Sequence, residues 1–501
     1  NNFREAKNKG FEVLELAKKH KEFEAVLDAI ALLAEVEHRQ GNDLKAIELS
    51  NQLISRIEDL SSRFSNPDRL TSFRHKVYDY LKNAVVYELS QNRIDSAFAK
   101  LDYAKARSLK HTDELSNGMS NQVKFIDVDL LKSSLDQKTV VLDYMVTQDT
   151  LYVFMITNEG NQLLKRGINA NELQKTVYQY KTRIDKTIET FHDYTPSKAK
   201  EHFEGTSELS HKLFEELLGW PALIEKLNNI ERLYIIPDDF LFELPFATLG
   251  VADSAYLIQK VAVITSPGAS FLMRANKNLE IQNITDKKGL ISVDPSLPGA
   301  TELLSFLRRT FPSGVELNVN GEPSRQLVLE KLNKAFDFYI IVGHGVADSK
   351  YPERSYIEFN VRNTNTDRVS KIRLTVEDLK EINWSQTSMV LLVGCETGGG
   401  KLYRGTGITG LQQSFLSWGV KNVLASLWKI EANQTIPQIQ DFILKWSKVS
   451  NPAIALREMQ LKAIEKLSNN KFYQFPHPYY WGSYILLHGV TEPYIFKDNN
   501  Y

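Results

Sequence analysis

Two five-residue apolar runs, each followed by glycine and a reactive side chain, constrain the fold of this chain more than any other feature. The run 338–342 leads into Gly343-His344-Gly345, and the run 389–393 leads into Gly394-Cys395. Continuous apolar runs of this length are typical of parallel strands that are buried on both faces. Because chemistry in parallel sheets sits beyond the carboxyl ends of the strands, we expect His344 and Cys395 to lie together at one edge.

The first 117 residues show helical periodicity only. Their apolar positions recur on helical faces, and turn residues such as Gly41-Asn42-Asp43 separate the segments 23–34, 44–57, 70–85 and 94–104. Alanine-rich second helices after short polar turns resemble tetratricopeptide-type hairpins. We therefore predict an all-α helical-repeat domain over residues 1–117. A helical bundle that merely supports the next domain is the alternative.

From residue 118 onward, strand patterns alternate with helix patterns, which predicts an α/β fold with a mostly parallel, doubly wound sheet. Residues 118–275 form one predicted unit, with a hairpin at 140–144 and 151–156, a helix at 171–191, and buried strands at 233–236 and 261–264. Residues 276–501 form the next unit. Its predicted strands are 289–293, 315–319, 338–342, 357–359, 389–393, 422–426 and 484–487, and its predicted helices are 300–311, 324–335, 407–418, 436–447 and 452–467.

A short internal similarity links these two units. The segment 225–236 resembles the segment 330–341, but the first copy continues into Pro237-Asp238-Asp239 and the second into Val342-Gly343-His344. Two related lobes, of which only the second keeps a reactive histidine, would explain this pattern. Chance similarity of two helix–strand units is the alternative.

The pairing of His344 with Cys395 predicts nucleophilic catalysis. Only a few per cent of a free thiol is thiolate at pH 7, so a thiol nucleophile needs a neighbouring imidazole. A histidine about 50 residues before a cysteine at a strand end is the caspase-type arrangement. The backbone N–H groups of Gly345 and Cys395 are then the natural donors to an oxyanion. A buried structural cysteine and a histidine in a turn are the simpler alternative.

Composition excludes several other classes of protein. The 501 residues contain 61 Lys and Arg against 62 Asp and Glu, for a net charge of −1, so no global basic surplus indicates direct nucleic-acid binding. The apolar runs are too short for a membrane helix, and no secretory leader is recognisable. The single cysteine excludes an intramolecular disulfide framework and fits the cytoplasm. The chain begins at Asn1, so a fragment or trimmed form is expected.

Two other motifs carry less weight. Gly398-Gly399-Gly400-Lys401 resembles a phosphate-binding loop, but that motif needs glycine where Cys395 stands and Ser or Thr where Leu402 stands. His477 and His488 lack the cysteine or carboxylate neighbours of a metal site, so we expect core or capping roles. Neither a metal nor an organic cofactor is predicted.

Several stretches of the sequence resemble the CHAT-domain family, a group of caspase- and separase-like cysteine peptidases, here behind tetratricopeptide-type helices. The matching stretches span most of residues 95–490: Tyr103–Leu109, Ile236–Phe246, Asp294–Ala300, Val342–Gly345, Pro352–Ser355, Gly394–Gly400, Ala425–Trp428 and His477–Trp481. The resemblance implies a caspase-like catalytic domain over 276–501, with His344 and Cys395 as the catalytic pair. It also implies that 118–275 is the inactive half of the CHAT region.

A regulated cytoplasmic endopeptidase follows from this resemblance, with a protein substrate and a protein or ribonucleoprotein activator bound by residues 1–117. The resemblance implies a prokaryotic setting, with defence as one such role. A non-catalytic CHAT scaffold or protein-interaction module is the rival. In relatives, the residue two before the nucleophile lines the P1 pocket, and here it is Val393. An Asp-specific pocket is therefore not expected. A basic P1 residue fits if Glu431, Asp238 or Asp239 reaches the pocket, and a long apolar one fits otherwise.

Overall fold

The computed structural model describes most of the chain, including both strands that precede the candidate catalytic residues. The described residues are 3–64, 67–117, 125–185, 196–251, 255–272, 283–346, 348, 354–394, 401–403, 407–409, 411–428, 432–469 and 476–489. Cys395 and Glu431 lie outside them. The predicted domain boundary at 117 falls at the last described residue of a helix, and the boundary at 275 falls within the undescribed segment 273–282.

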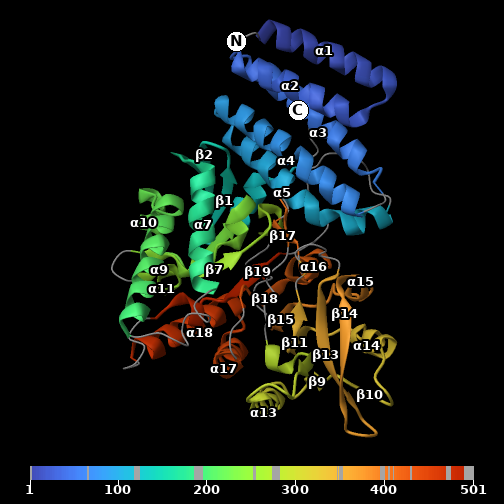
Figure 1. Ribbon diagram of the computed structural model, residues 1–501, viewed down its shortest axis with the longest axis vertical. Helices are drawn as coiled ribbons and strands as arrows, with labels where there is room; N and C mark the ends of the chain where they lie inside the picture. Colours follow the sequence, from blue (N-terminus) through green and yellow to red (C-terminus); the bar gives the residue numbers. More distant parts are fainter. Residues whose placement is uncertain are drawn as a thin grey trace.

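Five helices form the N-terminal region, and each packs against its neighbour in the sequence. They are α1 (Phe3–His20), α2 (Phe23–Arg39), α3 (Asp43–Ser61), α4 (Pro67–Ser90) and α5 (Ile94–Asn117). The predicted turn after α2 is confirmed. Gly41 adopts φ 82°, a left-handed conformation that favours glycine. Figure 1 shows these helices at one end of the molecule, beside the first half of the sheet.

One eleven-stranded sheet crosses both predicted α/β units, in the order β3-β2-β1-β4-β7-β19-β18-β15-β11-β8-β9. Its strands are β1 (Thr139–Val146), β2 (Thr150–Ile156), β3 (Asn161–Gly167), β4 (Arg232–Ile236), β7 (Ala262–Thr265), β8 (Gly289–Val293), β9 (Val315–Glu316), β11 (Phe338–Val342), β15 (Met389–Val393), β18 (Asn422–Ser426) and β19 (Tyr484–His488). The mostly parallel sheet with helices and the helical N-terminal region confirm the predicted fold class. The predicted hairpin is β1 and β2, which pair antiparallel.

The strand direction reverses at β19, in the middle of the sheet. This strand runs antiparallel to β18 but parallel to β7, which it meets at the single pair Leu487 and Thr265. The strands β1, β4 and β7 are mutually parallel, as are β8, β11, β15 and β18. The carboxyl ends of the two sets of parallel strands therefore lie at opposite edges of the sheet.

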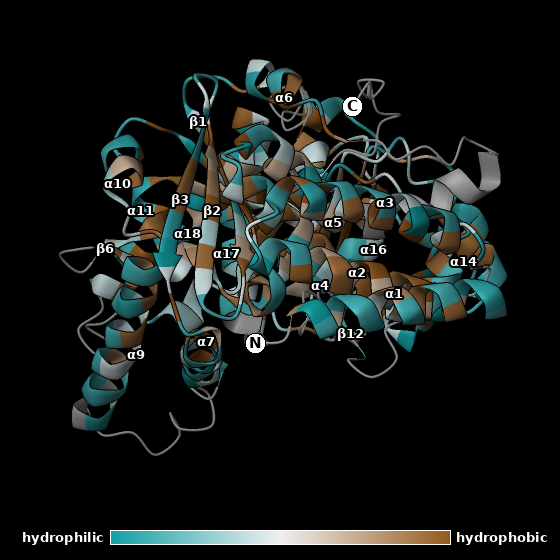
Figure 2. Cartoon of the chain, turned by 90° about the horizontal axis from the view of Figure 1, so that it is seen from above, coloured by the Kyte–Doolittle hydropathy of each residue, from teal (hydrophilic) through white to brown (hydrophobic). Residues whose placement is uncertain are grey.

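Alternation of side chains buries both faces of the half of the sheet that contains β11 and β15. On β11, Phe338 and Ile340 face a core that includes α13 (Ala300–Thr310), α17 (Ala432–Val449) and α18 (Pro452–Ser468). Tyr339 and Ile341 face the opposite core, which includes α14 (Arg325–Leu332), α15 (Val376–Leu379) and α16 (Leu411–Ser417). In Figure 2 the buried strand β1 is coloured mainly as hydrophobic, whereas the surface helix α9 (Pro196–Leu217) is mainly hydrophilic.

The remaining elements complete the layers around the large sheet. A smaller sheet joins β10 (Asn318–Val319), β12 (Gly345–Val346), β13 (Tyr356–Asn363) and β14 (Val369–Thr375). The other helices are α6 (Val128–Ser134), α7 (Ala170–Asp185), α10 (Pro221–Leu227) and α11 (Leu257–Lys260), and two short hairpins are formed by β5 (Gly250–Val251) with β6 (Ala255–Tyr256) and by β16 (Lys401–Tyr403) with β17 (Gly407–Thr409).

Two predicted elements differ from the structure. The predicted strand 315–319 divides into β9 and β10, which belong to different sheets. Leu317 lies between them, and its N–H still donates to the carbonyl of Ile291 on β8 (2.9 Å). The predicted helix 407–418 begins only at Leu411. Residues 407–409 pair instead as β17, and Gly407 and Thr409 are both poor helix formers.

Both C-terminal histidines have the structural roles that the sequence predicted. His477 is buried, and its Nδ1 accepts the N–H of Tyr479 (3.2 Å) at the start of a 3₁₀ turn. His488 is fully buried, with its Nδ1 2.8 Å from the side-chain oxygen of Asn422. In the part of the chain that the structure describes, none of the helices combines the length and hydropathy needed to cross a bilayer.

These buried histidines predict loss of stability in mild acid. Burial lowers the pKa of His477 to about 3 and that of His488 to about 4, against about 6.5 in the unfolded chain. The unfolded state therefore binds more protons below pH 6.5, and stability falls as pH drops from about 6.5 toward 4. At pH 5 we expect each histidine to cost about 2 kcal/mol relative to pH 7. Urea unfolding of wild type and of His477→Gln at both pH values measures the contribution of His477 to this loss of stability.

The exposed His20 provides the matched control, because His20→Gln removes a histidine from the surface of α1. His477→Gln should have a smaller stability difference between pH 7 and pH 5 than wild type, whereas His20→Gln should keep the wild-type difference. An unchanged difference in His477→Gln would contradict the assignment of acid sensitivity to this buried imidazole.

Candidate functional site

The strands β11 and β15 are direct neighbours in the sheet, parallel and in register. Val342 pairs with Val393 at their carboxyl ends, and the N–H of Gly343 donates to the carbonyl of Val393 (2.9 Å). His344 and Gly394 consequently leave the sheet side by side. Cys395 follows Gly394 directly, outside the described residues. The register thus brings the histidine and the residue before the cysteine to one edge, as the sequence predicted.

His344 lies at this edge with a half-exposed side chain, and the end of β8 supplies its acidic neighbour. The Nε2 atom of His344 is 3.5 Å from Oδ2 of Asp294, whose side chain is fully buried. The carbonyl of His344 accepts the N–H of Glu358 (2.9 Å), which anchors the loop to β13. The imidazole is therefore within ion-pair range of a buried carboxylate, and its backbone is fixed to β13.

Asp294 was not singled out by sequence reasoning as a site residue. It follows the apolar strand β8 in the way that His344 and Cys395 follow theirs, and that shared position is the signal in the sequence. Burial alone would raise its pKa, but hydrogen bonds from Lys371 and from the backbone and hydroxyl of Ser296 hold the pKa of this carboxyl below its usual value. The carboxylate beside His344 is therefore ionised at neutral pH.

Three potential metal ligands meet here, since side-chain atoms of Asp294, His344 and Glu358 all lie within 4.8 Å of one another. The two carboxylates already have cationic partners. Lys371 Nζ lies 2.8 Å from Asp294 and 3.1 Å from Glu358, and Arg373 also contacts Glu358 (3.1 Å). These cations would repel a divalent metal ion, so the cluster is an ion-pair network that orients the loop around His344.

Gly345 begins β12 and pairs with Ile357 of β13. This pairing fixes the backbone directly after His344, next to the end of β15. The predicted role of its N–H in an oxyanion hole remains a prediction, because the other predicted donor, Cys395, lies outside the described residues.

The structure does not bring the predicted pocket residues together. Val393 is 3% exposed and belongs to the core beneath the sheet edge. Asp238 and Asp239 follow β4, which runs opposite to β11 and β15, so they do not lie at the carboxyl ends of those strands. Glu431 is outside the described residues.

Asp238 is instead part of the interface with the N-terminal helices. Its fully buried carboxylate accepts hydrogen bonds from the Tyr78 hydroxyl (2.6 Å) and the Val146 N–H (2.7 Å), and it pairs with Lys82 (2.7 Å). Lys82 also contacts Asp239 (2.9 Å). Both carboxylates therefore have structural partners on α4.

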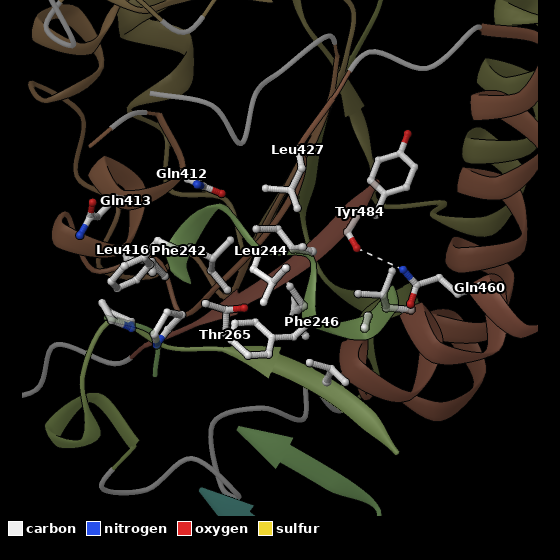
Figure 3. A pocket seen from close by; sticks show the side chains of 18 residues that line it. Phe242, Leu244, Phe246, Thr265, Gln412, Gln413, Leu416, Leu427, Gln460 and Tyr484 are labelled. Atoms are coloured by element: carbon white, nitrogen blue, oxygen red, sulfur yellow. Dashed lines mark hydrogen bonds between the residues drawn. The ribbon is translucent and has the colours of Figure 1, made fainter. Parts of the chain in front are cut away.

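A small cavity lies at the seam between the two halves of the sheet, where β7 and β19 share only one residue pair (Figure 3). Its lining combines Phe242, Leu244 and Phe246 with side chains from α16, α18 and β19, and Gln460 donates to the carbonyl of Tyr484 (3.2 Å). Its volume of about 30 Å³ suits a water molecule rather than a substrate.

Comparison with solved structures identifies the fold. Two crystal structures of the Saccharomyces cerevisiae separase–securin complex, at 3.0 and 2.6 Å, superpose with TM-scores of 0.55 and 0.54, both at 12% identity. The matches cover 89% and 90% of this chain, but only 37% and 38% of the matched chains. This chain thus spans little more than a third of their length. The likeness establishes a separase-like, caspase-like cysteine-peptidase fold.

No curated protein matches the sequence significantly. The family model of the CHAT domain matches residues 207–489, which is more than half of the chain and includes every strand from β4 to β19. The matched region contains His344, Asp294 and Cys395, and it begins within the predicted unit 118–275. The chain therefore belongs to the CHAT-domain family.

Proposed function

We propose that this protein is a regulated cysteine endopeptidase that uses His344 and Cys395 as its catalytic dyad. The observation that carries this proposal is the register of β11 and β15, which directs His344 and the residue before Cys395 to one edge of the sheet. Cys395 attacks the substrate carbonyl as a thiolate, and His344 assists its ionisation and then protonates the leaving amine. The N–H groups of Gly345 and Cys395 stabilise the oxyanion.

Asp294 acts as a positioning residue in this scheme. Its ionised carboxylate, 3.5 Å from Nε2 of His344, restrains the orientation of the imidazole. Because Lys371 and Ser296 hold Asp294 in place, the carboxylate needs no reorganisation during the reaction.

A CHAT scaffold without turnover is the rival hypothesis, and the single cysteine of the chain makes the two easy to separate. An electrophilic peptide probe that reacts with activated thiols can label only Cys395. If the protein is a peptidase, the probe should label wild type and the control variant His20→Ala. Labelling should be lost in His344→Ala. Equal labelling of His344→Ala and wild type would support the scaffold.

The N-terminal helices are proposed to bind a protein or ribonucleoprotein activator, in the cytoplasm of a prokaryote and as part of a defence response. Large apolar side chains that are more than two-fifths exposed support this proposal, because they concentrate on α1–α3: Phe11, Val13, Leu16, Phe23, Leu32 and Leu44. The separase structures were solved with the protein partner securin, which is a further reason to expect a protein ligand.

A chain of contacts leads from these helices toward the candidate site. Lys82 of α4 pairs with Asp239, the first residue of a 3₁₀ turn over Asp239–Glu243. Asp239 adopts φ 47°, a conformation that costs a non-glycine residue about 1 kcal/mol. The same turn contacts β16 and β17, which follow the Cys395 segment in the sequence. We infer that a partner on the helices regulates the site along this path.

Substrate preference provides another prediction. Val393, two residues before the nucleophile, is buried in the core and supplies neither charge nor a hydrogen bond to a substrate. This position therefore offers no cation to an aspartate at P1, whose lost hydration would cost roughly 2 kcal/mol or more. We therefore expect the activated enzyme to cut peptide libraries after a basic or long apolar residue. A basic P1 residue is favoured if Glu431 lines the pocket, and Glu431→Gln would then reduce cleavage after basic residues. A clear preference for Asp or Glu would contradict this prediction.

A further inference from the structure

A second pocket lies beside the candidate catalytic cluster, between α13, the ends of β8 and β9, and the inner face of β13. Its volume is about 270 Å³. The lining is mixed, with apolar, hydroxyl, charged and amide groups that include Val293, Thr301, Leu304, Arg308, Glu316 and Asn360. Sites for drug-sized ligands occupy about 300–1,000 Å³, so this pocket suits one side chain better than a whole small molecule.

The pocket contains a buried amide with unused hydrogen-bonding capacity. Asn360 is only 5% exposed, and neither its side-chain nitrogen nor its side-chain oxygen has a partner among the described residues. Its backbone, by contrast, is fixed by the hydroxyl of Ser292, which accepts the Asn360 N–H (3.0 Å). A buried polar group normally has a partner, because leaving it unpaired is costly. The vacant donor and acceptor together match another carboxamide.

The charges in the pocket favour a neutral ligand. Arg308 is paired with Glu316 (2.5 Å), and Arg362 is paired with Asp367 (2.6 Å). Both guanidinium groups that line the pocket therefore have carboxylate partners. A substrate carboxylate would have to compete with these partners, whereas a carboxamide can pair with the buried, unpartnered amide of Asn360 without displacing them.

The position of the pocket relates it to the reaction. Glu358, Asn360 and Arg362 alternate onto the same face of β13, so the pocket and the cluster around His344 share one face of this strand. A Cβ atom placed on Gly343 would lie 3.3 Å from the Asn360 side-chain nitrogen. In the strand order β15-β11-β8-β9, the pocket lies beyond His344 on the side away from β15. His344 protonates the leaving amine, so the leaving part of the substrate extends to this side.

We infer that this pocket is a substrate subsite that binds an asparagine or glutamine side chain on the leaving-group side of the scissile bond, through paired hydrogen bonds to Asn360. The inference rests on the proposed peptidase function. It adds a specificity determinant on β13, in a part of the sequence where no motif pointed to substrate binding.

Cleavage of a proteome-derived peptide library by the activated full chain tests the subsite. We expect Asn and Gln to be enriched about tenfold at one position after the cut. This factor corresponds to the net free energy of two neutral hydrogen bonds. The enrichment should vanish in Asn360→Leu and persist in Asn365→Leu, a matched change at an exposed position on the same hairpin. Cleavage without this enrichment in wild type would overturn the subsite, whereas absence of all cleavage would overturn the peptidase function.

A titration that needs no turnover provides the second readout. The Cys395→Ala chain, labelled with ¹⁵N-asparagine, gives a side-chain amide signal for Asn360 that is assigned by its loss in Asn360→Leu. Millimolar N-acetyl-glutamine methylamide should shift this signal, and the leucine analogue should not. An unmoved signal, or an equal shift with leucine, would overturn the subsite. A larger shift with the glutamate analogue would overturn the preference for a neutral side chain.

Discussion

Replacement of Cys395 or His344 by alanine should lower peptide cleavage by the activated full chain by a factor of about 10⁴ or more. Without the thiol no covalent intermediate forms, and without the imidazole the thiol remains mostly protonated. The register of β11 and β15 makes the two effects interdependent. The double variant should therefore be about as inactive as either single variant. Cleavage rates of the three variants, measured under the same conditions, test this.

Loss of folding must be separated from loss of chemistry in these variants. The side chain of His344 is half-exposed and lies beyond the end of β11, outside the packed core, so His344→Ala should unfold at nearly the same urea concentration as wild type. His20→Ala serves as the matched control, because it removes an exposed histidine far along the chain from the site. A folded Cys395→Ala protein that cut its substrate at the wild-type rate would exclude Cys395 as the nucleophile.

The sequence predicted four strands of the sheet, β8, β11, β15 and β18, with the same limits that the structure has. The strands β11 and β15 are continuous apolar runs and the other two are mainly apolar, so local pattern alone locates them. The reversal at β19 could not be predicted in this way. Strand direction within a sheet depends on which distant segment a strand pairs with. The sequence of residues 484–487 does not indicate which strands they pair with.

The same distinction explains the site. The strands that precede His344 and Cys395 could be predicted as neighbours because both belong to one parallel set, and β11 and β15 do pair directly. Asp238 was associated with them only on the assumption that β4 runs in that direction too. Asp294 was missed because its contact with His344 joins segments 50 residues apart, and no short motif records such a contact.

The N-terminal helices are packed into the core of the α/β region, which limits how their role can be tested. Phe98 and Leu101 of α5 belong to the same apolar cluster as Val141 and Phe154 of the sheet. Removal of residues 1–117 would expose this cluster and leave Asp238 without Lys82. Regulation is therefore better tested in the full chain, by adding the partner or by changing single interface residues.

Lys105 is the interface residue with the largest expected effect on stability. Its ammonium is 1% exposed and contacts Asp143 (2.6 Å), together with the carbonyls of Tyr144 (2.6 Å) and Pro237 (3.0 Å). It thereby joins α5 to the ends of β1 and β4. Lys105→Met should destabilise the full chain by about 3–5 kcal/mol, because it leaves a buried carboxylate without its cation. Urea unfolding at pH 8 measures this loss.

Three comparisons identify the cause of that loss. Lys45→Met removes an exposed lysine that pairs with Glu48 on α3, and it should change stability by less than about 1 kcal/mol. The double variant Lys105→Met/Asp143→Leu should recover most of the loss, because no unpaired charge remains.

Burial already raises the pKa of Asp143 to about 7, although Lys105 opposes the rise. Without Lys105 the pKa of this carboxyl rises further, so protonation relieves the penalty and Lys105→Met should lose less stability at pH 5 than at pH 8. A loss that is equal at both pH values would show that packing, rather than the unpaired charge, is responsible.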